Sequence, residues 1–126
     1  MMVWSLDARI PLILLADRAA LAAALAEGGP AAVLAKGAAP VLPEGAVAVI
    51  GFDPAAHPVR CDCGTCGGRN AAALALDLLF QARARGSVPW FARVVALLQS
   101  DSARTTVREA LEADTVTRAR YRLAMG

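Results

Sequence analysis

Short, uninterrupted apolar runs alternate with helical patterns along this chain, and they constrain its fold more than any other feature. Residues Ile10–Leu15 are apolar without a break, and Asp17 is suited to cap a helix that continues through Glu27. Ala46–Phe52 forms a second apolar run of this kind. A strand without polar alternation is typical of a sheet covered on both faces, and intervening helices favour parallel pairing. The chain is therefore predicted to adopt an α/β fold.

The remaining segments continue the alternation of strands and helices. Asn70 is expected to cap an amphipathic helix that continues to about Arg85 and ends at Gly86. Ala31–Ala35 fits either a short strand or a helical turn. We predict one domain, residues 1–126, with three layers in which helices flank a small, mostly parallel sheet. The further predicted elements are a strand at Phe91–Leu98, a helix that Asp101 or Ser102 caps and that ends near Ala113, and a last short helix at Thr115–Leu123.

The composition argues against a membrane protein. Of the 126 residues 57% are hydrophobic, but 30 are alanine, whose small side chain supplies little apolar area. The first apolar run ends at Asp17, whereas a membrane-spanning helix needs about 20 mostly apolar residues. Asp7 and Arg9 cancel ahead of this run and Pro11 interrupts it, which argues against a secretory signal. We therefore expect a cytoplasmic protein that does not contact a membrane.

Basic residues gather in the C-terminal third of the chain. Residues 83–126 contain eight arginines and four acidic residues, although the net charge of the whole chain is only +2. These arginines alternate with apolar residues at helical spacing, which indicates a solvated, salt-bridged helix face rather than a nucleic-acid surface. The single lysine, Lys36, is not followed by Ser or Thr as a phosphate-binding lysine would be. We expect neither nucleic acid nor nucleotide as a ligand.

All candidate metal ligands of the soft class lie in one loop, which is predicted at about residues 53–69. The only histidine, His57, and all three cysteines, Cys61, Cys63 and Cys66, fall within ten residues. Three thiolates and one imidazole on a glycine-containing loop form the ligand set of a closed tetrahedral zinc site. An iron–sulfur cluster is the alternative cofactor, although such clusters usually have four thiolates. A disulfide is a weaker alternative because the cysteine count is odd.

The order of these features resembles the first half of the CobW-type metallochaperone GTPases. In that family a Gly-Cys-x-Cys-Cys loop precedes a long helix, as the Cys61–Cys63 pair does here. Residues Ala82–Val95, with the letters ARARGSVPWFARVV, are similar to the family stretch that leads into the next strand. Residues Ala119–Leu123, ARYRL, are similar to a later family segment. The resemblance implies a P-loop-NTPase-like half domain and a role in metal handling or metalloprotein assembly.

The departures from this family point away from catalysis. The family's phosphate loop, Gly-x-x-Gly-x-Gly-Lys-Thr, is replaced by Leu15–Ala20, which has no glycine and no lysine. Leu97–Asp101 stands where the family has a Glu-Thr-x-Gly stretch, and the guanine-reading segment would fall beyond Gly126. The third loop cysteine of the family corresponds to Gly64, so the family's metal geometry need not carry over to Cys66. We therefore expect a pseudo-GTPase that is not an enzyme.

Two functions of different classes follow. The first is a non-catalytic, zinc-binding protein that takes part in metal handling or in the assembly of a metalloprotein. The alternative is a structural or interaction subunit of a larger complex, in which the Cys/His loop is a metal staple: the bound metal only stabilises a segment that is otherwise weakly held. A small open sheet ends in unpaired strand edges, so a protein partner or a homodimer is expected for either function.

Overall fold

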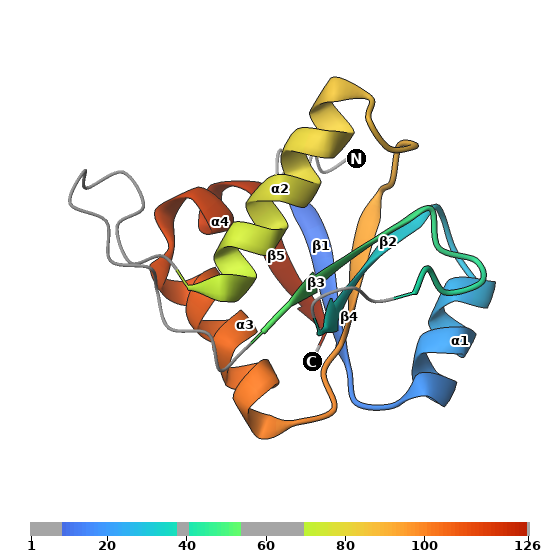
Figure 1. Ribbon diagram of the computed structural model, residues 1–126, viewed down its shortest axis with the longest axis horizontal. Coiled ribbons are helices and arrows are strands. Elements are labelled where there is room, and N and C mark those ends of the chain that lie inside the picture. The colour runs from blue at the N-terminus through green and yellow to red at the C-terminus, as the bar shows by residue number, and fades with distance from the viewer. Residues whose placement is uncertain (1–8, 38–40, 54–69, 126) are drawn as a thin grey trace, which may run out of the picture.

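A five-stranded, all-parallel sheet forms the centre of the molecule (Figure 1). The structure is a computed structural model, and it describes residues 9–37, 41–53 and 70–125. The strand order is β3-β2-β4-β1-β5, which confirms the predicted α/β class with a small parallel sheet. The strands are β1 (Ile10–Leu15), β2 (Ala31–Lys36), β3 (Ala48–Phe52), β4 (Arg93–Leu97) and β5 (Tyr121–Met125). The helices are α1 (Arg18–Ala26), α2 (Ala71–Arg85), α3 (Asp101–Ala113) and α4 (Thr115–Arg120).

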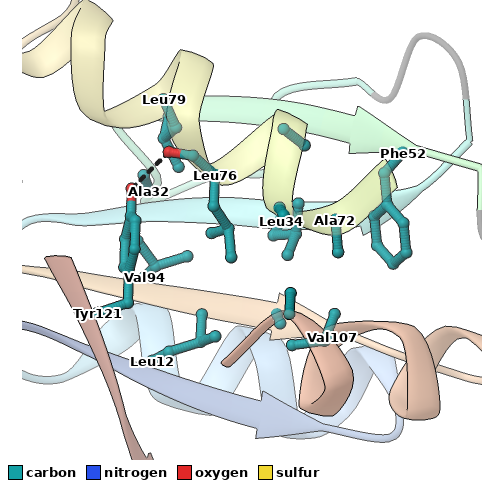
Figure 2. Close-up of a cluster of buried hydrophobic side chains, with 14 of the residues drawn as sticks. Leu12, Ala32, Leu34, Phe52, Ala72, Leu76, Leu79, Val94, Val107 and Tyr121 are labelled. Carbon is teal, nitrogen blue, oxygen red and sulfur yellow. Dashed lines mark hydrogen bonds between the residues drawn. The ribbon is translucent and has the colours of Figure 1, made fainter. Parts of the chain in front are cut away.

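Helices cover both faces of the sheet, so the molecule has three layers. Side chains alternate along each strand, and one set, which includes Leu12 and Leu34, packs against α2 and α3 in the larger core (Figure 2). The other set, which includes Val33 and Val95, packs against Leu21 of α1 in a smaller core. The central strands β2 and β4 are buried on both faces, which is why their sequences lack polar alternation.

Capping residues begin or end the helices at, or one residue from, the positions that the sequence indicated. The carboxylate of Asp17 accepts a hydrogen bond from the amide of Ala20 at the start of α1, over 2.7 Å. Gly86 ends α2 in the left-handed conformation, with φ of 74°. Ser100 caps α3, one residue before the earlier of the two predicted positions, because its hydroxyl accepts from the amide of Ala103. Each cap satisfies amides or carbonyls that the first or last turn leaves free.

Two segments differ from their sequence-based interpretation. Ala31–Lys36 is a strand, which decides between the two alternatives that the sequence left open. The predicted last helix at residues 115–123 is wrong beyond Arg120, because Tyr121–Met125 forms the edge strand β5. Tyr121 pairs with Ile10 of β1 and buries its ring in the larger core. This long-range pairing outweighs the helical spacing of the preceding arginines.

The strand order creates a switch point at the carboxyl edge of the sheet. Strands β1 and β4 are neighbours, but β1 continues into α1 on one face and β4 continues into α3 on the other. The amide of Leu98 donates to the carbonyl oxygen of Leu15 over 2.8 Å and holds these two strand ends together. Open α/β sheets bind ligands in the crevice outside such a point. None of the helices described is long and apolar enough to cross a membrane.

Candidate functional site

The predicted metal ligands His57, Cys61, Cys63 and Cys66 all belong to residues 54–69, which lie outside the described residues. The structure therefore does not test whether they meet. Elsewhere in the chain, the described residues contain no group of three or more His, Cys, Asp or Glu side chains that could hold a metal ion. What the structure does describe is how the chain enters and leaves this segment.

The chain enters the segment from the carboxyl end of β3. Phe52, the last residue of β3, is buried in the larger core beside α2. Its carbonyl oxygen accepts a hydrogen bond from the amide of Gly37 over 2.8 Å, so the ends of β2 and β3 are tied together. Asp53, which follows, is exposed. The end of β3, from which the chain enters the segment, is thus fixed on the sheet.

The chain leaves the segment at Asn70, which begins α2 with two side-chain hydrogen bonds. Its amide oxygen accepts from the backbone amide of Ala73 over 2.9 Å. Its amide nitrogen donates to the carbonyl oxygen of Thr106 in α3 over 2.6 Å. Ala72 is completely buried, and Figure 2 shows it beside Phe52. Both ends of the candidate metal-binding segment are therefore held at the same edge of the sheet, the one at which β3 ends.

The turn from β1 into α1 is the segment that the sequence resemblance aligns with a phosphate loop. Its free amides are turned toward the Asp17 carboxylate, which accepts from Ala20, and the carbonyl of Asp17 accepts from Leu21. A phosphate at this helix end would meet a negative charge and would have to displace an existing cap.

The segment after β4 is likewise occupied by hydrogen bonds within the protein. The hydroxyl of Ser100 caps α3, and the guanidinium of Arg104 donates to the carbonyl oxygen of Leu98 over 3.3 Å. The sequence resemblance aligns this turn with the Glu-Thr-x-Gly stretch of the CobW-type GTPases. Its polar groups hold the end of the strand to α3.

The residues that carry the sequence resemblance serve the packing of α2 and β5. The guanidinium of Arg83 lies over the ring of Trp90 at 3.5 Å, while Phe91 is fully buried beneath it. Burial lowers the pKa of Arg83, and the nearby Tyr121 opposes this shift. Arg120 forms a salt bridge with Asp77, and its guanidinium lies over the ring of Phe80 in α2. These contacts stabilise the packing of α2 against its neighbours in the fold.

One feature of the carboxyl edge was not predicted from the sequence. A cavity of about 470 Å³ lies between α1, the sheet and the segment 41–44. Its polar lining includes Arg18, Lys36 and Gln99, which follow or end three different strands, and also Glu44. The sequence marked Lys36 as the single lysine but gave no strand order, and without that order these three residues could not be placed together.

No family model matches this chain, and neither does any curated protein or solved structure. The similarity to CobW-type GTPases therefore stays a prediction based on the quoted residues. Function has to be inferred from the chain's own side chains and from the edge of the sheet to which they are attached.

Proposed function

We propose that this chain is a non-catalytic, zinc-binding, pseudo-GTPase-like protein that takes part in metal handling or in the assembly of a metalloprotein. The observation that carries the proposal is the attachment of the segment with the four soft ligands. Phe52 and Asn70 fix its two ends at the carboxyl edge of the sheet, where Figure 2 shows Phe52 beside Ala72, two residues after Asn70. Fixed ends shorten the loop that a metal has to close, which lowers the entropic cost of gathering the ligands.

The ligand chemistry favours zinc as the metal. His57, Cys61, Cys63 and Cys66 provide one imidazole and three sulfur atoms, and zinc binds such sets in tetrahedral geometry. A cluster of iron and sulfur is the alternative cofactor, and it would need the histidine in place of a fourth thiolate. With four protein ligands the zinc would have no open position for a substrate, which agrees with a role other than catalysis.

The N-terminus of α1 supports the absence of GTP hydrolysis. The carboxylate of Asp17 accepts the hydrogen bond that a phosphate would receive there. Neither glycine nor lysine lies in the turn between β1 and α1. A protein of this kind would keep the metal-binding part of the family scheme and would not turn over nucleotide.

Metal analysis of the purified protein tests the proposal. Protein prepared without added metal is analysed by inductively coupled plasma mass spectrometry and by ultraviolet-visible spectroscopy. We expect about one zinc per chain in the wild type. Cys63→Ser should lose the metal, whereas Asp62→Asn, a change between two of the cysteines that removes no soft ligand, should keep it. Metal-free protein with three titratable thiols would overturn the proposal, and a brown sample containing iron would replace zinc with a cluster.

A second function, a structural or interaction subunit, is favoured by the exposed face of α2. Leu74 and Leu78, one turn apart, are both exposed on this helix, and Trp90 is 63% exposed. A partner could cover these side chains while the metal only staples the neighbouring segment. The rate of zinc transfer to a chelator separates the two functions, because a handling site should exchange within minutes and a staple should hold its metal until the protein unfolds.

A further inference from the structure

The cavity at the carboxyl edge of the sheet has the position of a ligand site. Arg18 follows β1 and Gln99 follows β4, so two of its lining residues flank the switch point between these strands. Lys36 ends β2, the next strand along the sheet. Crevices outside the carboxyl ends of strands at such points are where open α/β sheets bind small molecules. This position does not depend on the proposed metal site, which follows β3.

The interior of the cavity is apolar. Its floor is formed by Val33 and Leu97 of the sheet, and its wall by Leu21 and Leu25 of α1. Its volume of about 470 Å³ falls within the range of pockets that hold small organic ligands, about 300–1,000 Å³. A molecule that enters would therefore bury an apolar body against aliphatic side chains.

A short, mostly apolar segment, residues 41–44, also lines the cavity. Val41 is 88% exposed, and Leu42 beside it is also largely exposed, although both line the cavity. Gly45 fixes the far end of this segment against Leu25, to which an added Cβ at Gly45 would approach within 3.3 Å. Exposed apolar side chains at the mouth would gain contacts when a ligand is bound.

The charged residues around the cavity favour an anionic ligand. Arg18 and Lys36 are cationic and Glu44 is anionic, so the lining carries a net positive charge. Neither cationic side chain forms a hydrogen bond or ion pair within the described part of the chain. The amide of Gln99 can donate a further hydrogen bond. Two cations that have no partner among the described residues, beside an apolar interior, match a ligand with one negatively charged end.

We propose that this cavity binds a small organic acid, a molecule with a compact apolar body and one carboxylate. The apolar body would lie between α1 and the sheet, and the carboxylate would face Arg18 and Lys36. The proposal concerns binding alone: among the described residues that line the cavity there is no cysteine, histidine, serine or threonine.

Three probes with the same chain test this proposal: octanoate, 1-octanol and octylammonium. Each is titrated into isotope-labelled protein while the backbone amide signals are followed by NMR. We expect saturable shifts at Leu21, Val33 and Leu97, with octanoate bound at least about threefold more tightly than 1-octanol, and octylammonium bound most weakly. Equal affinity for all three probes, absent or unsaturable shifts, or shifts that gather on the exposed face of α2 would overturn it.

Charge variants and a filling variant complete the test. The double substitution Arg18→Gln with Lys36→Gln should abolish the preference for octanoate, whereas Arg85→Gln, on the opposite face of the sheet, should preserve it. Ala22→Phe, at an exposed position that lines the cavity, should weaken octanoate binding at least about fivefold while the spectrum stays that of a folded protein. Unchanged octanoate affinity in either cavity variant would contradict the assignment.

Discussion

The hydroxyl of Tyr121 donates a hydrogen bond to the backbone carbonyl oxygen of Leu76 over 2.8 Å (Figure 2). This bond joins the last strand, β5, to the middle of α2 across the larger core. Tyr121 is 1% exposed, and its ring meets that of Phe80 edge to face, with centroids 6.4 Å apart. Helix α2, which begins where the candidate metal-binding segment ends, is thus anchored to the edge strand β5, which follows it by more than thirty residues.

Removal of this hydroxyl should destabilise the protein without changing its shape. Tyr121→Phe keeps the buried ring but leaves the second lone pair of the Leu76 carbonyl without its donor. We expect the free energy of unfolding to fall by about 1–2 kcal/mol. Urea unfolding, followed by circular dichroism, measures the change. An effect near zero would show that water replaces the hydroxyl at this position.

The same residue should make stability depend on alkaline pH. Burial raises the pKa of Tyr121 well above its usual value of 10, Asp77 adds to the shift, and Arg83 and Arg120 oppose it. In the unfolded chain the phenol releases its proton near pH 10, while the folded protein keeps it. Its contribution to stability is therefore complete below pH 10 and is lost as the pH rises toward the folded pKa, by up to about 1.4 kcal/mol per pH unit.

Two measurements check this pH dependence. Urea unfolding at a series of pH values should show a steeper loss above pH 10 in the wild type than in Tyr121→Phe, in which all other groups are the same. Tyr121 is the only tyrosine of the chain, so the tyrosinate absorbance of the folded protein reports this residue alone. Tyrosinate that forms at the ordinary pH of a free tyrosine would contradict the expectation.

Arg93 should contribute more to stability than its place at the start of a strand suggests. Its guanidinium donates to the carbonyl oxygens of Ala24, over 2.8 Å, and of Gly29, over 3.1 Å, and so closes the C-terminal end of α1. Arg93→Met removes these bonds and a cation that favours the helix terminus. We expect a loss of about 2 kcal/mol in urea unfolding. Arg93→Lys, which keeps the charge but can reach fewer carbonyls, should lose less; equal losses would show that charge contributes nothing.

Local signals were sufficient to predict most of the fold. The run Ile10–Leu15 is a strand with the predicted bounds, and Asn70 and Gly86 delimit α2 as their capping preferences indicated. These segments contain their own start and stop signals. Tyr121–Met125 does not, because its strand depends on pairing with β1, more than a hundred residues earlier in the chain. Its local pattern continued the preceding helix, so a helix was predicted.

The two candidate sites, the Cys/His segment and the cavity, also differ in whether the sequence alone could reveal them. The metal ligands could be proposed from sequence because all four lie within ten residues, and they stay a prediction because residues 54–69 lie outside the description. The cavity could not be proposed, since Arg18, Lys36 and Gln99 come together only through the strand order. Spacing along the chain reveals a site on one loop, whereas a site between strands requires the topology.

Two glycines in similar backbone conformations should respond differently to substitution. Gly45 and Gly86 have φ of 92° and 74°, so alanine at either position is strained by about 1–2 kcal/mol. At Gly86 the added Cβ meets no atom within 4 Å, but at Gly45 it would lie 3.3 Å from Leu25. We therefore expect Gly45→Ala to lower the free energy of unfolding more than Gly86→Ala does. The difference between the two, measured by thermal or urea unfolding, isolates the contact with α1, and equal effects would mean that Leu25 moves freely.

Asn70 should determine how firmly the candidate metal-binding segment is held at its C-terminal end. Asn70→Ala removes both the cap on Ala73 and the bond to Thr106, and we expect metal-free protein to lose about 1–2 kcal/mol in urea unfolding. Asn70→Asp keeps the acceptor at the helix N-terminus and removes only the donor, so its loss should be smaller. If the segment binds zinc, Asn70→Ala should also weaken zinc binding in competition with a chelator. The first turn of α2 would fray without its cap, so more of the chain would have to be ordered when the metal binds. Equal destabilisation by both substitutions would assign the effect to the bond with α3, and unchanged zinc affinity would show that the ligands gather without this anchor.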